Sequence, residues 1–378
     1  MSTKDLVLKL HRWGGLATGL VAFLLSLTGA VLLITMPADT ARAGQIGRAN
    51  TGAPLLPPSA ILAAARATMP DVRPRSLEIR FVDTRRAEVQ FSENTIASID
   101  PWDGSVIEVR PESDSLSGDW IHFHSNLMLG AIGKSVVGIS TIVFVLLAAL
   151  GLWLWWPNRR TVRRAFLIQL RRGFKRANYD IHNVLGFYSA LLLLILGLTG
   201  VLLAYPGLQG TTASILGRVM PEGSPPAAPP AAEASRTATD SPPAGPDATM
   251  DDTPAIDRAW AAARGLYPDA PWQRAFLVGT PTRFRVQVGA GDPGDLHRHH
   301  LIQLDAEGRL VRVTPADRIP LRTRLPVLVG RIHTGDMGGA YRVAAFLACL
   351  VGVTLPVTGF LVWFPRWRRR RRAGTAET

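Results

Sequence analysis

Four long apolar runs constrain this chain more than any other feature of its sequence. They cover residues 13–35, 136–156, 184–205 and 343–364. A helix needs about 20 apolar residues to cross a bilayer, so each run is long enough to span one. The chain is 47% hydrophobic but also 19% charged, which excludes both an ordinary soluble protein and a fully embedded one. The sequence therefore predicts a mainly α-helical membrane protein, with a four-helix bundle in the lipid bilayer.

Basic residues give the expected orientation of the spans. The net charge is +13, but the arginine clusters at residues 158–180 and 366–372 directly adjoin apolar runs, as juxtamembrane charges do, so we expect no nucleic-acid partner. The positive-inside rule then predicts a bacterial inner-membrane protein with both termini cytoplasmic and with periplasmic segments at residues 37–121 and 207–332. The first apolar run is longer than the core of a signal peptide, which favours a retained anchor.

The two periplasmic segments have similar patterns. Each predicts one amphipathic helix, near residues 58–68 and 254–265, followed by four short strands and thus a small α+β module. A proline and alanine-rich stretch precedes the second module and indicates a disordered linker. A proline follows every apolar run, and we expect the helices to end there. The boundaries that we expect are residues 1–36 for the first transmembrane helix, 37–121 for the first module, 122–157 for the second transmembrane helix with an outer extension, 158–180 for a basic cytoplasmic loop, 181–206 for the third transmembrane helix, 207–253 for the linker, 254–332 for the second module, 333–365 for the fourth transmembrane helix with an outer extension, and 366–378 for a basic tail.

The chain is also a tandem repeat. His11 begins the first span and Thr28-Gly29 lies later in it; His182 and Thr199-Gly200 lie at the same places in the third span, with a common offset of 171 residues. Two halves of span, module and span, both pointing the same way across the membrane, are therefore expected. The Thr-Gly pairs, including Thr358-Gly359, are best interpreted as points of close helix packing.

Histidines at repeat-equivalent span ends are the candidate site. His11 and His182 lie at the cytoplasmic ends, and His124 and His333 at the outer ends. His122 is the alternative outer residue, because residues two apart on a helix cannot both point into the bundle. Single histidines could simply lie in the headgroup layer, but four equivalent ones point to a ligand.

Facing imidazoles on helices of a bundle are typical of six-coordinate haem, so the four histidines are predicted axial ligands of haem iron, with two haems b per chain. Because iron would have no open position, electron transfer is the expected chemistry. Candidate partners for the haem propionates are Arg12, Arg331 and Arg342. His297, His299 and His300 could capture a metal, but with no repeat partner they are more simply a surface cluster.

The sequence resembles the PepSY-associated transmembrane family in its His11-Arg12-Trp13 start, its Trp120-to-His124 segment and its Trp155-Trp156-Pro157 close. The resemblance covers nearly the whole chain and implies PepSY-like periplasmic modules. It also implies a similarity to ferric-siderophore reductases of the inner membrane, which bind b-type haems through span histidines. The third span departs from the pattern, with Asn183-Val184 where the first has Arg12-Trp13, so the inner site could be asymmetric.

Two functions of different classes follow. The first is an oxidoreductase that passes electrons outward to a ferric siderophore or other ferric chelate. Because the sequence has no nucleotide fingerprint and no long cytoplasmic segment, its electrons must come from a membrane donor, either a quinol or a redox protein. The alternative is a membrane-anchored PepSY binding or regulatory protein, such as a peptidase or assembly regulator, without redox activity.

Overall fold

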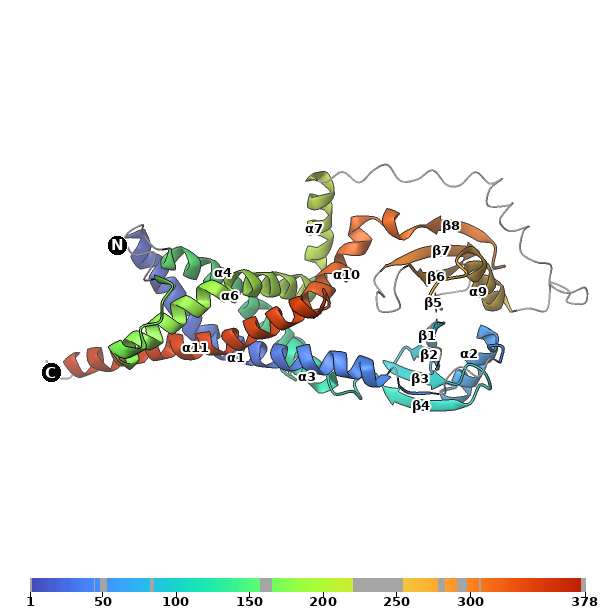
Figure 1. Ribbon diagram of the computed structural model, residues 1–378, viewed down its shortest axis with the longest axis horizontal. Helices are drawn as coiled ribbons and strands as arrows, with labels where there is room; N and C mark the ends of the chain where they lie inside the picture. The colour runs from blue at the N-terminus through green and yellow to red at the C-terminus, as the bar shows by residue number, and fades with distance from the viewer. Residues whose placement is uncertain are drawn as a thin grey trace, which may run out of the picture. The chain divides into compact units, whose positions relative to one another are not determined.

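The computed structural model consists of a helical unit and a sheet unit, each contributed by several segments of the chain (Figure 1). The residues described are 2–43, 45–47, 53–81, 85–156, 165–219, 254–277, 283–290, 298–305 and 307–374. The helical unit contains residues 1–39, 116–215 and 325–378, and the sheet unit contains residues 40–115 and 216–324. The chain therefore leaves the helical unit and returns to it twice, once for each half of the repeat.

Among the described residues, four helices are long and apolar enough to cross a membrane, which confirms the mainly helical membrane fold. They are α1 (Thr3–Ala43), α4 (Gly130–Trp155), α6 (Phe174–Ala204) and α11 (Gly339–Gly374, apolar to Phe364). Small residues bring these helices together. A Cβ on Gly14 would meet the Leu147 side chain of α4 at 3.0 Å, and one on Gly29 would meet Cys349 of α11 at 3.5 Å. Close packing at small residues is the usual basis of helix association in lipid.

Shorter helices flank the spans. They are α3 (Gly118–Asn126), α7 (Pro206–Val219), α10 (Leu321–His333) and the 3₁₀ turn η1 (Leu170–Arg172). The sequence did not predict α7, which occupies the start of the expected linker; residues 220–253 lie outside the described part. Helix α6 begins seven residues before the expected boundary at residue 181, because Asp180 accepts the backbone N–H of Gln169 at 3.1 Å and pairs with Arg176 at 3.0 Å, which anchors its first turns.

Two of the expected helix ends were wrong. Helix α1 continues through Pro37 to Ala43, and α11 continues through Pro365 to Gly374. A proline inside a helix removes one backbone hydrogen bond. Near the end of a span, water or neighbouring groups can satisfy the carbonyl group that is freed, so the helix need not stop.

The sheet unit contains both modules, each with the one helix and four strands that the sequence predicts, and in each module the four strands form an antiparallel meander. The first module comprises α2 (Pro58–Thr68), β1 (Pro74–Arg80), β2 (Ala87–Phe91), β3 (Thr95–Ile99) and β4 (Val106–Pro111). The second comprises α9 (Ala255–Leu266), β5 (Trp272–Phe276), β6 (Arg283–Gly289), β7 (His299–Asp305), β8 (Leu310–Thr314) and the 3₁₀ turn η2 (Ala316–Arg318). Alternating burial along β2, with Ala87, Val89 and Phe91 inside, is the two-residue period of a half-buried strand.

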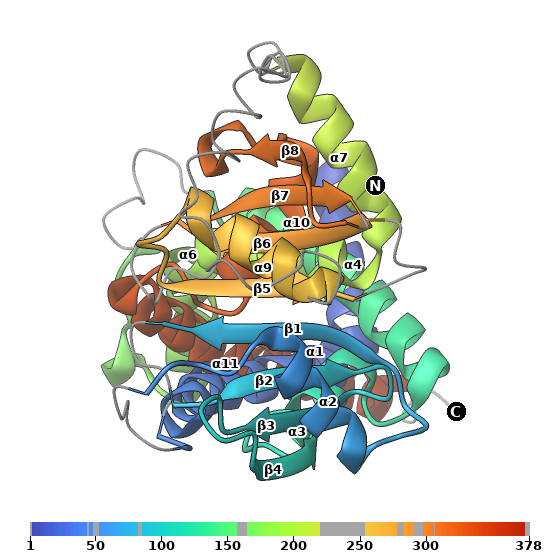
Figure 2. The ribbon, with the colours of Figure 1, turned by 90° about the vertical axis from the view of Figure 1, so that its right-hand side faces the viewer.

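The two modules share one eight-stranded sheet, which the sequence did not predict. Its order is β4-β3-β2-β1-β5-β6-β7-β8, with β1 and β5 antiparallel at the seam (Figure 2). Pairing the first strands satisfies backbone groups that each module alone would leave exposed. Helices α2 and α9 lie on the same face of the sheet and share its hydrophobic core. Asp257 of α9 also accepts the backbone N–H of Ser59 in α2 at 2.8 Å, which joins the modules a second time.

Candidate functional site

The four predicted histidines form two pairs in the helical unit. His11 of α1 faces His182 of α6, with ring centroids 6.4 Å apart and an interplanar angle of 82°. His124 of α3 faces His333 of α10 at 6.0 Å and 56°. The expected pairing is therefore present at both ends of the bundle. Of the two outer alternatives, His124 is the residue that faces His333, whereas His122 is exposed.

Each histidine ring lies against a glycine of another helix in its own half of the repeat. A Cβ on Gly151 of α4 would stand 3.1 Å from Cε1 of His11, and one on Gly29 of α1 would stand 3.5 Å from Cε1 of His124. The second half repeats the arrangement, with Gly359 3.4 Å from His182 and Gly200 3.1 Å from His333. Each pair thus takes one imidazole from each half, and each half supports its own imidazole.

Hydrogen bonds fix which ring nitrogen carries the proton. Nδ1 of His11 lies 3.1 Å from the carbonyl oxygen of Leu147, and Nδ1 of His333 lies 3.0 Å from that of Leu196. A carbonyl oxygen only accepts, so both Nδ1 atoms must donate. In the neutral ring this leaves Nε2 with a lone pair, the form in which histidine binds metals.

Threonine hydroxyl groups impose the same tautomer on the other two rings. Nδ1 of His124 lies 2.8 Å from Oγ1 of Thr28, and Nδ1 of His182 lies 2.9 Å from Oγ1 of Thr358. Each hydroxyl donates its own proton to a carbonyl of its helix, at 2.8 Å and 2.9 Å, so its oxygen is left to accept from the ring. Thr199 lies 3.1 Å from Nδ1 of His333 in the same way.

The Thr-Gly pairs therefore do more than provide the close helix packing that the sequence predicts. Their glycines do allow close approach, but of an imidazole ring, and their threonines accept hydrogen bonds from those rings. The fourth position departs from this pattern, because Leu150 precedes Gly151 where Thr358 precedes Gly359. His11 consequently bonds to a backbone carbonyl, and no hydroxyl group in the described part of the chain bonds to it. The two rings of the inner pair therefore have different hydrogen-bond partners, a backbone carbonyl for His11 and a threonine hydroxyl for His182.

The two outer histidines lie on short helices that are separate from the spans, whereas the sequence predicted outer extensions of the spans. The chain bends between α3 and α4 at Leu127, Met128 and Gly130, which have φ values of 53°, 59° and 57°. Between α10 and α11 it bends at Gly335 and Gly338, with φ values of 76° and 109°. These left-handed residues end each short helix and set its direction independently of the span.

Asp39 at the end of α1 holds α3 in place. Its carboxylate accepts the backbone N–H groups of Leu116 and Ser117, both at 2.8 Å, and the hydroxyl of Ser117 at 2.6 Å. These groups immediately precede α3, so Asp39 satisfies donors that the first turn of a helix cannot satisfy by itself. The helix that carries His124 is thus tied to the helix that carries its glycine.

Two of the three candidate propionate partners lie beside the outer pair. Arg331 lies two residues before His333 in α10 and 3.5 Å from Asp336; Arg342 in α11 lies 3.8 Å from the same carboxylate. Within the described residues, Nε of Arg342 is buried without a hydrogen-bond partner. Arg12 follows His11 in α1 and is partly exposed.

The remaining histidines lie in the second module. His299 and His300 are consecutive in β7, so their side chains point to opposite faces. His300 stacks on Tyr267 at 3.9 Å and 15°, and His299 lies 6.3 Å from Trp272. His297 lies outside the described residues. Among the described residues, no group of three His, Cys, Asp or Glu side chains is arranged to hold a metal ion.

Four candidate spans in two tandem halves, joined to a double α+β module, define a multi-pass membrane protein with a substantial part outside the bilayer. The chain matches the family described as the PepSY-associated TM region over residues 8–366. Because the match covers nearly the whole sequence, the chain belongs to this family, and the two modules are PepSY-like. No curated protein matches the chain.

Proposed function

We propose that the chain is a haem-b electron-transfer protein of the bacterial inner membrane that reduces ferric siderophores or other ferric chelates on the periplasmic side. The observation that carries this proposal is the pair of facing imidazoles at each end of the bundle, 6.4 Å and 6.0 Å between ring centroids. Two imidazoles bound to one iron would be roughly 6 Å apart, since each metal–nitrogen bond is about 2 Å and each ring centre lies about 1 Å behind its nitrogen.

The donor set also fits haem. All four imidazoles have Nδ1 committed to a carbonyl or hydroxyl oxygen, which leaves Nε2 free to bind a metal. His11 and His182 would hold an inner haem, and His124 and His333 an outer one. When bound between two histidines, haem supplies reversible one-electron transfer and offers no open position to oxygen.

The two sites are suitably placed for transfer across a membrane. His11 and Thr28, which supports His124, are 17 residues apart in α1. At 1.5 Å per residue the inner and outer sites are therefore about 25 Å apart along the helix, close to the thickness of a bilayer core. By the positive-inside rule, the basic residues at the termini and at residues 158–180 support a cytoplasmic position for His11 and a periplasmic position for the modules.

Other residues of the chain have supporting roles. The glycines at positions 29, 151, 200 and 359 leave room for the rings, and the threonines hold their orientation. Arg342 would pair with a propionate of the outer haem, because its buried Nε has no partner among the described residues. Arg331 is the second cation at that end, and Arg12 is the equivalent candidate at the inner end. The electron donor would be a quinol or a redox protein of the membrane.

A reduced-minus-oxidised visible spectrum of the detergent-purified protein, with pyridine-haem quantification, tests the proposal. We expect two haems in the wild type and about one in His11→Ala and in His333→Ala. His122→Ala is the matched control, since His122 lies two residues from His124 but is exposed, and it should retain two. Wild-type protein without haem after haem-replete expression would refute the proposal and favour a PepSY binding or regulatory protein.

A further inference from the structure

The eight-stranded sheet has a second face, opposite to the hydrophobic core beneath α2 and α9. We call it the polar face. Residues that alternate with core residues point to it, including Glu78 of β1 between Leu77 and Ile79, and Arg285 of β6 between Phe284 and Val286. This face carries most of the charged side chains of the strands, and their distribution over the two modules is uneven.

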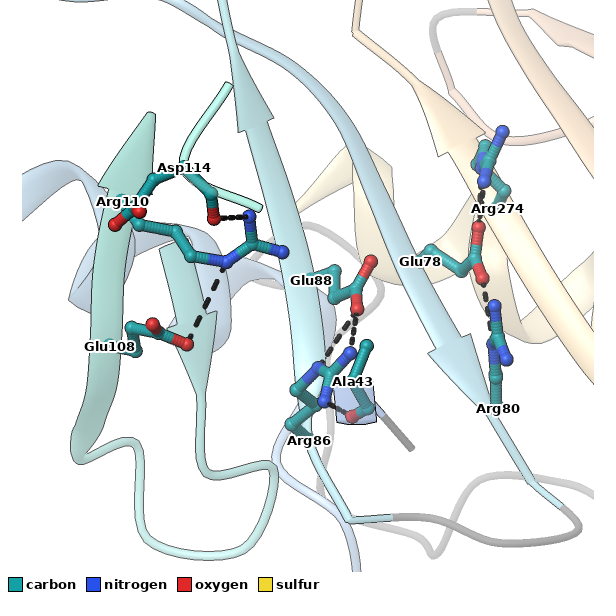
Figure 3. A network of polar contacts seen from close by, with 9 residues as sticks. All are labelled: Ala43, Glu78, Arg80, Arg86, Glu88, Glu108, Arg110, Asp114 and Arg274. Atoms are coloured by element: carbon teal, nitrogen blue, oxygen red, sulfur yellow. Dashed lines mark hydrogen bonds and ion pairs between the residues drawn. The ribbon is translucent and has the colours of Figure 1, made fainter. Parts of the chain in front are cut away.

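In the first module, every glutamate of the polar face is paired with arginine (Figure 3). Glu88 binds Arg86, and Glu108 lies 3.8 Å from Arg110. Glu78 at the seam binds Arg80 at 3.2 Å and also Arg274 of the second module. The part of the polar face that belongs to the first module is therefore close to neutral. Arg274, at the seam, is the first arginine of the second module on this face.

In the described part of the second module, the polar face carries two arginines without ion-pair partners, and its carboxylate in β7, Asp305, is already paired with Arg309 at 2.8 Å. Arg285 and Arg312 are both exposed, and neither has an ion-pair partner among the described residues. The strand register places both beside Gln303, with Arg285 opposite Gln303 in β6 and β7 and Arg312 opposite Gln303 in β7 and β8. Arg285, Gln303 and Arg312 thus form one row across three strands.

The geometry of this row suits a small molecule with several carboxylates. Neighbouring strands are about 4.8 Å apart, so the two arginines are attached about 10 Å apart, with an amide between them. Arginine binds a carboxylate through two parallel hydrogen bonds, and the amide can donate a third contact. A flat anionic membrane surface would instead extend over the neutral, ion-paired half of the face, where it would gain nothing.

We propose that Arg285, Gln303 and Arg312 bind an anionic, carboxylate-bearing ferric chelate. This inference rests on the proposed function for its physiological meaning, because it names the class of chelate that would be reduced. The row gives the second module a substrate-binding role that the first module, with its paired charges, does not share.

Equilibrium dialysis of the full-length protein against gallium(III) citrate tests the inference. Gallium(III) is not reduced, so binding is measured separately from electron transfer, while haem content is measured in parallel. The variant Arg285→Gln/Arg312→Gln should raise the Kd at least tenfold, since two charge-assisted contacts are lost. Arg110→Gln is the matched control: it removes an arginine from the same face in the first module and should leave the Kd unchanged. Raising the salt concentration should weaken wild-type binding.

Three results would overturn the inference: an equal Kd in the double variant, an equal loss in Arg110→Gln, or tighter binding of sn-glycerol 3-phosphate than of gallium citrate, which would indicate a lipid headgroup. A cationic gallium trihydroxamate should bind no better to wild type than to the double variant. Selective gallium citrate binding by a protein without haem would refute the proposed function and leave the binding site standing. Two haems without selective binding would do the reverse.

Discussion

The glycine beneath each imidazole provides the sharpest test of the site, because the four glycines differ in how much room they leave. A Cβ added at Gly200 would lie 3.1 Å from Cε1 of His333, which is too close without a shift of a few tenths of an ångström. A Cβ at Gly29 would lie 3.5 Å from Cε1 of His124, an ordinary contact. Alanine at these two positions therefore changes the same outer pair, but only Gly200→Ala should displace a ring.

The expected size of the effect follows from two opposing terms. Alanine in place of glycine favours the helix by up to about 1 kcal/mol, and this gain is shared by both variants. Overpacking a well-filled site costs about 1–3 kcal/mol, and only Gly200→Ala incurs it. The His333 ring cannot tilt away freely, because Nδ1 is bonded to Leu196 at 3.0 Å and to Thr199 at 3.1 Å. Gly200→Ala should therefore be less stable than Gly29→Ala by about 1–3 kcal/mol.

Thermal unfolding in detergent, followed by circular dichroism, measures this difference. For a unit of roughly 200 residues, 1 kcal/mol corresponds to a change in Tm of about 2–4 °C, so Gly200→Ala should unfold at least about 2 °C below Gly29→Ala. The pair Gly151→Ala and Gly359→Ala repeats the test at the inner site, with contacts of 3.1 Å and 3.4 Å. Equal Tm values within both pairs would refute the argument that the glycines are fitted to the imidazole rings.

Three further outcomes are expected. Thr358→Val removes an acceptor of His182 Nδ1–H and should weaken haem binding at the inner site about fivefold, since such a bond contributes about 1 kcal/mol. Haem transfer to excess apomyoglobin measures this change, and an unchanged transfer rate would contradict the prediction. Glu78→Gln, at the seam and 5% exposed, should speed hydrogen exchange in β1 and β5, whereas Glu108→Gln, with a side chain 36% exposed, should not. Burial lowers the pKa of His300 below its usual 6.5, an effect that a nearby aspartate partly offsets, and Nδ1 of His300 accepts a backbone N–H at 3.2 Å. The folded state therefore binds fewer protons than the unfolded state, so the module should lose stability as the pH falls below about 6.5. Thermal unfolding should show that His300→Gln reduces this pH dependence.

The sequence predicted the elements well where a simple period governs them. The sequence predicts strands at residues 87–91 and 95–99, and β2 and β3 have these bounds. In β2 the apolar residues Ala87, Val89 and Phe91 alternate with polar ones, which is the period of a half-buried strand. The spans follow from apolar length alone. The facing of His11 with His182 could be predicted because both begin equivalent spans of the repeat, 171 residues apart. The facing of His124 with His333 could be predicted because each lies at a similar distance before the proline that follows its span, Pro157 or Pro365.

The sequence could not predict features that depend on contacts between distant segments. Nothing in β1 or β5 distinguishes a strand that ends a module from one that joins it to another, although Glu78 and Arg274 at the seam are complementary once the register is known. The threonine hydroxyls were likewise missed, because Thr-Gly is also the ordinary signature of close helix packing. Only the three-dimensional arrangement shows that Thr28 lies beside His124, 96 residues away.

The tandem repeat accounts for the arrangement of the two histidine pairs. Each half supplies one imidazole to the inner pair and one to the outer pair, and it supports both with glycines of its own helices: Gly151 for His11 and Gly29 for His124 in the first half. A half by itself would therefore have two well-oriented imidazoles and no complete pair. Two equivalent halves together complete both pairs at once, as a symmetric dimer of single halves would. Because the two halves are joined in one chain, each can diverge from the other. Leu150 stands in the first half where Thr358 stands in the second, and the unpaired arginines of the second module have no counterparts in the described part of the first.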